Sequence, residues 1–267
     1  MWGADDLPVG TGAVQREQIE ASLTDPNSAY RRLRRVMDAW AALWFWPITA
    51  TVEAPTREQW LDALEALLGT MSRSEARQGR GMFAGDLTWT ELDDAEHNEA
   101  AFAQMKPVVE VVQAHPWLGV CEQIAEKEGF FHWELDFAPV FAQRGGFDLQ
   151  VGNPPWVRPD WDDALVLAED DAWFGLVDKP AVDVVRERRK DVLHDGDERY
   201  LDERALVAGT STHLGSMVDR PVLANLRPDL YRCFMDRTWR SMNTTGIVGL
   251  IHPESHFTEE RAGGLRR

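Results

Sequence analysis

The sequence predicts an α/β protein whose C-terminal half contains a parallel sheet. Three observations support this class: a short strand pattern at Phe147–Val151, helical apolar spacing between Leu230 and Met242, and a continuous apolar run at Ile247–Ile251. A strand, a long connection, a helix and a second strand are the order expected for a parallel α/β unit. We expect the last strand to be covered on both faces, because it is apolar throughout.

The first half of the chain is predicted to be helical. Apolar residues recur at helical spacing over Leu33–Trp44, and Pro47 ends the run because proline lacks a backbone donor. A second helix has a capping-box pattern, with Thr56 as N-cap and Gln59 three positions on, and Gly69 follows its end.

The following segments are less regular. A Gly/Ser/Arg-rich loop is predicted at 69–85, and helices are predicted around 95–112 and 117–128. Aromatic residues alternate with polar ones over Phe131–Phe137, which predicts a strand or extended segment. A turn is predicted at Asn243–Gly246, between the last helix and the last strand.

The change of pattern at Gly129 divides the chain into a helical region, 1–128, and an α/β region, 129–267. Within the second region, the charged stretch 161–227 has no clear periodicity, so its structure is left open. We find no internal repeat and no low-complexity tract.

Composition limits the class of protein. The chain has 267 residues and a hydrophobic fraction of 44%, so it can bury a sizeable core. Its formal net charge is −17. The charge argues against a small basic nucleic-acid binder but leaves room for one local basic face. No run of about 18 apolar residues occurs, and Asp5 and Asp6 argue against a secretory signal. We therefore expect a soluble cytoplasmic protein without a membrane partner.

Metal and redox roles are not expected. The two cysteines, Cys121 and Cys233, have neither ligand nor disulfide spacing. His252, Glu254 and His256 lack the spacing of a zinc-binding helix, and Pro253 would disrupt such a helix.

The residues that indicate chemistry are Asn153, Pro154, Pro155 and Trp156, which follow the strand Phe147–Val151. Ligands bind at the carboxyl ends of strands in open α/β sheets. The two prolines stiffen the backbone and supply no N–H, so the backbone of this segment offers mainly hydrogen-bond acceptors. An asparagine oxygen adds an acceptor, and an indole adds a flat stacking face. The four residues together suit an aromatic heterocycle that carries an amino group.

The segment Gly146–Val157 resembles the catalytic motif of adenine-specific DNA methyltransferases, in which a polar residue, two prolines and an aromatic residue follow a hydrophobic strand. It is most similar to the large methylases of restriction-modification and phage-defence systems. The resemblance implies a partial Rossmann-like class I methyltransferase sheet in 129–267, preceded by a helical insertion in 1–128. It also implies S-adenosylmethionine as methyl donor and double-stranded DNA as partner.

The resemblance further assigns roles to residues. Asn153 and the Pro154 carbonyl would accept the two amino hydrogens of a flipped adenine, and Trp156 would stack on the base. Pro155 is the second proline of this catalytic motif. Arg158 would contact a phosphate.

The pattern departs from the family where the methyl donor should bind. Gly10-Thr11-Gly12 is the nearest candidate for a Gly-rich donor loop, but it does not follow a clear strand. We therefore expect a truncated or split methyltransferase, with a second polypeptide supplying the missing donor-binding strands. The alternative is a non-catalytic structural or interaction subunit, or an inactive remnant, of such a system.

Two basic clusters leave two interpretations open. Arg31–Arg35 and Arg186–Lys190 each fit a solvated helix face, which is favoured, or a phosphate-binding surface.

Overall fold

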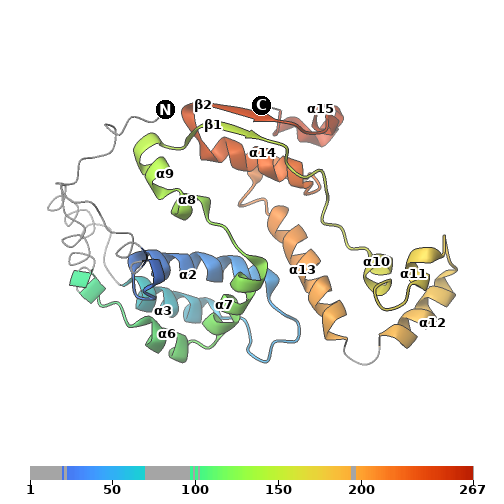
Figure 1. Cartoon of the computed structure of the whole chain (residues 1–267), viewed down its shortest axis with the longest axis horizontal. Coiled ribbons are helices and arrows are strands. Elements are labelled where there is room, and N and C mark those ends of the chain that lie inside the picture. Colours follow the sequence, from blue (N-terminus) through green and yellow to red (C-terminus); the bar gives the residue numbers. More distant parts are fainter. Residues whose placement is uncertain are drawn as a thin grey trace. The chain divides into compact units, whose positions relative to one another are not determined.

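A computed structural model of the chain describes residues 20, 23–69, 97–98, 100–101, 103–193 and 197–266. The chain divides into two compact units (Figure 1). Unit 1 comprises Met1–Ala41 with Val52–Phe130, and unit 2 comprises Ala42–Thr51 with Phe131–Arg267. The Gly10-Thr11-Gly12 segment and the predicted loop from residue 70 to 85 lie outside the described residues.

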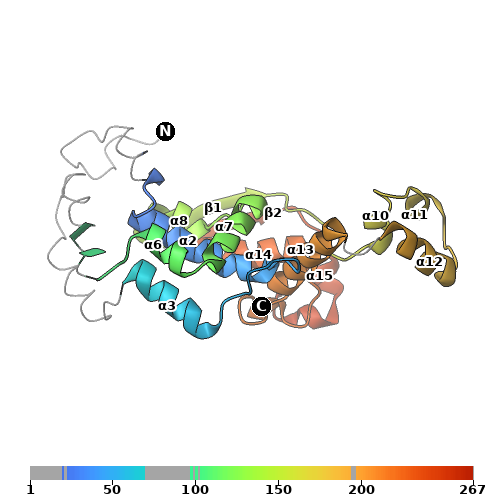
Figure 2. The same ribbon diagram turned by 90° about the horizontal axis from the view of Figure 1, so that it is seen from below.

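Unit 1 is helical, and its helices can be followed in Figures 1 and 2. They are α2 (Ala29–Ala42), whose last residue belongs to unit 2, α3 (Arg57–Leu68), α6 (Val108–Ala114) and α7 (Trp117–Glu128). The capping box of α3 is confirmed, because the Gln59 amide donates to Thr56 Oγ1 at 3.3 Å and the Thr56 amide donates to Gln59 Oε1 at 2.8 Å. The predicted helix over 117–128 is also confirmed.

A buried arginine joins the helices of unit 1. Arg32 of α2 is only 5% exposed. Its guanidinium donates to the carbonyl oxygens of Asn27 at 2.7 Å, Leu67 at 3.0 Å and Lys106 at 2.9 Å. Leu67 lies in the last turn of α3, where carbonyl groups lack helical partners, so the cation also suits the helix dipole. Arg32 is therefore neither on a solvated face nor open to a phosphate.

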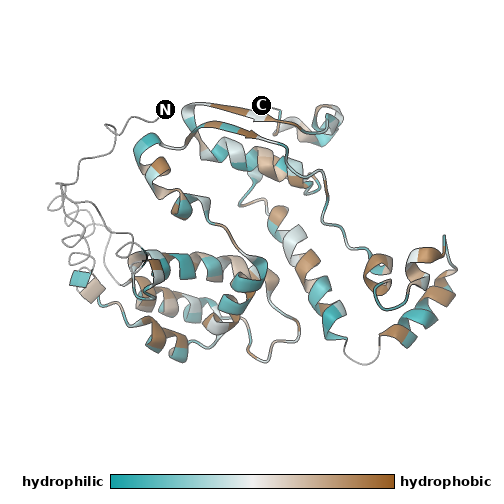
Figure 3. Ribbon diagram, in the orientation of Figure 1, coloured by the Kyte–Doolittle hydropathy of each residue, from teal (hydrophilic) through white to brown (hydrophobic). Residues whose placement is uncertain are grey.

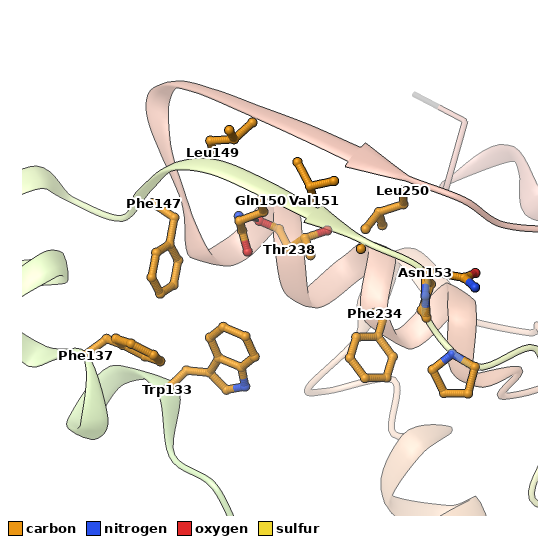
Figure 4. A pocket seen from close by; sticks show the side chains of 13 residues that line it. Trp133, Phe137, Phe147, Leu149, Gln150, Val151, Asn153, Phe234, Thr238 and Leu250 are labelled. Atoms are coloured by element: carbon orange, nitrogen blue, oxygen red, sulfur yellow. Dashed lines mark hydrogen bonds between the residues drawn. The ribbon is translucent and has the colours of Figure 1, made fainter. Parts of the chain in front are cut away.

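Unit 2 contains a two-stranded parallel sheet, which confirms the predicted strand pairing. Strand β1 (Phe147–Gly152) pairs with β2 (Met242–Leu250), and α14 (Leu230–Ser241) leads directly into β2. The expectation that both faces would be covered is wrong for the described residues. In β2, the last strand, Ile247 is 66% exposed. On the same side of the paired strand β1, Leu149 and Val151 are 63% and 77% exposed, whereas Gln150 on the other face donates to the Thr238 carbonyl oxygen (Figure 4).

The segment Phe131–Phe137 is not a strand, which corrects the prediction. It contains helix α8 (Trp133–Asp136), followed by α9 (Ala138–Arg144). Trp133 and Phe137 lie four positions apart, so the same aromatic pattern also fits one face of a helix. Their rings approach to 5.8 Å between centroids.

The predicted turn at Asn243–Gly246 lies inside β2. Pairing passes from Phe147 opposite Met242 to Leu149 opposite Ile247, so β2 contains an irregular excursion at this point. Asn243 still makes the local bond typical of a turn, because its Oδ1 accepts from the Thr245 amide at 2.8 Å. The local hydrogen bond of a turn therefore forms at Asn243, but β2 continues through this segment and pairs with β1 on both sides of it.

The charged stretch 161–227 is largely helical. It contains α10 (Asp163–Leu167), α11 (Trp173–Leu176), α12 (Val182–Val192), α13 (Glu198–Leu214) and the 3₁₀ turn η3 (Pro221–Leu223). Gly209 of α13 packs directly on the 3₁₀ turn η2 (Leu43–Phe45), since an added Cβ would lie 2.2 Å from the Trp44 carbonyl oxygen. The chain then ends with α15 (Ser255–Thr258) and η4 (Glu260–Gly263).

The second basic cluster lies on α12, which buries no residue. Arg189 pairs with Asp163 at 3.2 Å, and Lys190 pairs with Glu187 at 2.8 Å. This arrangement fits a solvated helix face, and phosphate contact by the cluster stays a prediction.

Hydrophobic and hydrophilic residues are interspersed along the helices (Figure 3). Within the described ranges, none of the helices combines the length and the apolar composition needed to span a bilayer.

Candidate functional site

The polar loop Asn153–Trp156 begins where β1 ends, as the sequence predicts. Asn153 and Pro155 are exposed, Pro154 is buried, and Trp156 is 57% exposed. Among the described residues, the Asn153 carboxamide has no hydrogen-bond partner. The loop therefore presents an uncommitted amide and an open indole face at the carboxyl end of a parallel strand.

Hydrogen bonds from neighbouring elements hold this loop in place. The Ile251 amide donates to the Gly152 carbonyl oxygen at 3.0 Å, which continues the ladder past the end of β2. Trp156 Nε1 donates to the Ile251 carbonyl oxygen at 3.3 Å. The Leu230 amide at the start of α14 donates to the Val157 carbonyl oxygen at 2.9 Å. The indole N–H is thus used within the fold, while its ring remains exposed.

Arg158 is tied to the start of α14. Its Nε lies 2.7 Å from Asp229 Oδ1, and this bond raises the pKa of the guanidinium. The Arg158 side chain is 35% exposed. A phosphate would have to share this guanidinium with Asp229, so the DNA contact of Arg158 stays a prediction.

An aromatic cavity lies behind the loop, against β1 (Figure 4). Its volume of about 440 Å³ is within the usual size of small-molecule pockets. It is lined by Trp133, Phe137, Phe147, Leu149, Gln150, Val151, Gly152, Asn153, Pro154, Pro155, Phe234, Thr238 and Leu250.

Two polar side chains of the cavity wall, those of Gln150 and Thr238, are already used within the fold. Gln150 Nε2 donates to the Thr238 carbonyl oxygen at 2.8 Å, and Gln150 Oε1 accepts from Ser241 Oγ at 3.0 Å. Thr238 Oγ1 donates to the Met235 carbonyl oxygen at 2.9 Å. The cavity therefore offers a ligand chiefly aromatic and apolar contacts. The Gln150 side chain is fixed by its hydrogen bonds to Thr238 and Ser241.

The Asn153 carboxamide does not point into this cavity. Figure 4 shows it directed away from the rings of Trp133 and Phe137. The acceptor site that the sequence predicts is therefore the outer edge formed by Asn153 and Trp156. Asn153, Pro154 and Pro155 of the loop also line the aromatic cavity, whereas Trp156 is not among its lining residues.

Sequence reasoning missed most of the cavity wall. Trp133 and Phe137 were placed on a strand, and no role was assigned to Gln150, Phe234 or Thr238. The spacing of Trp133, Phe137 and Phe141 is a signal that could have revealed the helical face. Phe234 could not have been found in this way, because only the strand pairing brings α14 beside β1.

The cysteines are unsuited to nucleophilic chemistry. Both are buried and free, and burial raises the pKa of Cys121 to about 12 and that of Cys233 to about 11. A thiol with so high a pKa is protonated at neutral pH and reacts slowly. Nor do three metal-binding side chains converge anywhere in the part of the chain that the structure describes.

Comparison with known proteins gives one family. A family model described as Eco57I restriction-modification methylase matches residues 58–172. The match includes all but the first residue of α3, and it includes β1 and the Asn153–Trp156 loop, but it covers less than half of the chain. Neither the curated proteins nor the solved structures contain a match. Over 58–172 the chain is therefore similar to restriction-modification methylases, which supports a methyltransferase family.

Proposed function

We propose that this chain is the acceptor-binding part of an S-adenosylmethionine-dependent, adenine-specific DNA methyltransferase, with its site at the carboxyl end of β1. The observation that supports the proposal is the unpartnered Asn153 carboxamide, held beside Pro154 and the exposed ring of Trp156. The similarity of residues 58–172 to restriction-modification methylases supports the same reaction class.

The chemistry follows from the acceptors. The amino nitrogen of adenine is a poor nucleophile, because its lone pair is delocalised into the ring. Asn153 Oδ1 and the Pro154 carbonyl oxygen accept its two hydrogens and stabilise positive charge as it develops on nitrogen. Trp156 stacks on the base, which has left the duplex at a cost of a few kcal/mol. Positioning and electrostatics would then favour formation of the N–C bond as the S–C bond of the sulfonium breaks, so that sulfur leaves as a neutral thioether and an amino proton is lost to solvent.

The methyl donor supplies an electrophilic carbon on a sulfonium. The described residues contain no Gly-rich turn between a strand and a helix that fits this donor, so we assign no donor-binding residue to them. The exposed apolar face of β1 and β2 supports a further proposal, a second polypeptide that covers the sheet and binds the donor.

Product analysis tests the reaction. The chain, together with the polypeptide that covers its sheet and binds the donor, is incubated with tritiated S-adenosylmethionine and a mixed-sequence duplex, and the methylated nucleosides are then separated. We expect N6-methyladenine; methylation confined to cytosine would contradict the adenine assignment. Calorimetry with S-adenosylmethionine addresses the alternative. Binding by the chain alone favours an enzyme that holds its own donor site. Absence of binding by the chain, together with absence of turnover when the donor-binding polypeptide is present, favours a non-catalytic subunit of a methylase system.

A further inference from the structure

A chain of hydrogen bonds ends in an exposed hydroxyl on the segment that follows β2. Arg232 Nε donates to the Tyr231 hydroxyl at 2.9 Å, and that hydroxyl lies 2.7 Å from Ser255 Oγ. Arg232 and Tyr231 are each 3% exposed, whereas Ser255 is exposed. The bonds therefore run from a buried cation outward to a serine at the surface.

The direction of these bonds follows from the donor inventory. A guanidinium can only donate, so the Tyr231 oxygen accepts from Arg232. The Tyr231 proton is buried, and leaving it without an acceptor would cost about 1–3 kcal/mol. Tyr231 therefore donates to Ser255, whose own proton is left for solvent or a ligand. No acceptor for that proton exists among the residues that the structure describes.

This hydroxyl belongs to the same edge of the sheet as the Asn153 loop. Ile251 follows β2. Its amide donates to the carbonyl oxygen of Gly152, the last residue of β1, and its carbonyl oxygen accepts from the Trp156 indole of the loop. Beyond Ile251, the His252 ring stacks on Tyr231, with ring centroids 5.8 Å apart and planes 13° from parallel. The segment that carries Ser255 is thus anchored at the carboxyl ends of both strands.

We propose that Ser255 is a specificity-determining residue that donates its hydrogen bond to an unprotonated ring nitrogen of the target base. This inference rests on the proposed methyltransferase function. Adenine offers two amino hydrogens and separate ring-nitrogen acceptors. Two acceptors, Asn153 Oδ1 and the Pro154 carbonyl, together with one donor at Ser255, match that pattern.

Local charge favours a neutral acceptor over a phosphate. The neighbour of Ser255 is the exposed carboxylate of Glu254, which would repel a phosphate. The positive charge of Arg232 is offset by Glu259 at 3.0 Å and Asp229 at 3.5 Å. A ring nitrogen carries no net charge, so Glu254 does not repel it and its binding does not depend on the charge of Arg232.

Base analogues test the assignment. Methyl transfer by the full chain with the donor-binding polypeptide is measured on duplexes whose target base is adenine or its 1-deaza, 3-deaza or 7-deaza analogue, in which one ring nitrogen becomes CH. For the wild-type protein, we expect one analogue to lower kcat/KM about five- to tenfold, the value of one hydrogen bond. Ser255→Ala should show a similar loss on adenine and no further loss on that analogue.

Two variants control for structure. Thr258→Val changes another hydroxyl of α15, which donates to the Ser255 carbonyl oxygen at 3.2 Å, and it should preserve the analogue preference. Ser255→Thr keeps a hydroxyl donor and should restore sensitivity to the same analogue.

The outcomes separate the inference from the function on which it rests. If Ser255→Ala lowers activity equally on adenine and on all three analogues, the donor role is overturned while the methyltransferase proposal stands. If the wild-type protein transfers no methyl group to adenine in the presence of the donor-binding polypeptide, the proposed function fails, and the Ser255 assignment fails with it.

Discussion

The two ends of the small sheet in unit 2 are built differently. At the amino end, Asp148 accepts from Arg144 and from Asn243, and Asn243 accepts in turn from Thr245. At the carboxyl end, the Asn153 carboxamide and the Ser255 hydroxyl proton have no hydrogen-bond partner among the described residues. Both ends are rich in polar side chains, so composition alone does not separate them. Satisfied polar groups stabilise the fold, whereas exposed and unsatisfied ones at the carboxyl edge are available for a ligand.

The largest expected effect comes from Asn153→Ala. Methyl transfer should fall about 100- to 1,000-fold, because a preorganised acceptor for developing charge is lost. The free energy of unfolding should stay nearly unchanged, since this carboxamide makes no bond within the described fold. Single-turnover kinetics and urea unfolding measure the two quantities. Unaltered turnover would overturn the acceptor role.

Asn243→Ala is the matched change at the other end. Its carboxamide is bonded to Asp148 and Thr245, and the residue is 8% exposed. The substitution should lower the free energy of unfolding by about 1–3 kcal/mol and leave kcat of the folded protein unchanged. A loss of turnover without loss of stability would contradict the contrast between the two ends.

Gly146→Ala sharpens the same comparison through the backbone. Gly146 has φ of 144°, and an added Cβ would lie 2.5 Å from the Ser241 carbonyl oxygen. We expect destabilisation of about 1–3 kcal/mol, because strained conformation and close contact coincide. Gly249, where an added Cβ meets nothing within 4 Å, provides the control Gly249→Ala. Thermal unfolding that shifts equally in both variants would argue against the close contact.

Trp156 separates stacking from positioning at the carboxyl end. Trp156→Ala removes the ring and should weaken transfer about 10- to 100-fold, in line with stacking worth about 1–3 kcal/mol per base. Trp156→Phe keeps a stacking ring but loses the bond to the Ile251 carbonyl oxygen, so a loss of about two- to tenfold is expected. Equal losses in kcat/KM for the two variants would show that stacking contributes nothing.

The smallest effect concerns pH. His256 is 4% exposed, and burial lowers its pKa below the ordinary value of 6.5. The unfolded chain therefore binds a proton at higher pH than the folded chain does. The contribution to stability is fully present above 6.5 and is lost as pH falls toward the folded pKa. His256→Gln should flatten the decline of unfolding free energy over this window, and an unchanged slope would contradict this assignment.

Local signals explain which elements could be predicted. The capping box of α3, the helical pattern of α14 and the strand before Asn153 depend on neighbouring residues, and all three were confirmed. The strand predicted at Phe131–Phe137 was wrong, because aromatic residues at alternate positions also recur at helical spacing. In the helical conformation, Phe137 packs against Phe147 of β1, with ring centroids 5.1 Å apart.

The sequence by itself determined where the chemistry-bearing loop lies, since rigid prolines after an alternating strand have few local conformations. The tertiary structure alone decided what surrounds that loop. Arg32 is buried and donates to the Leu67 carbonyl oxygen, Arg158 pairs with Asp229, and Ser255 is the exposed end of a hydrogen-bond chain. These roles depend on residues far apart in the chain, and only parallel strand pairing and helix packing bring such residues together.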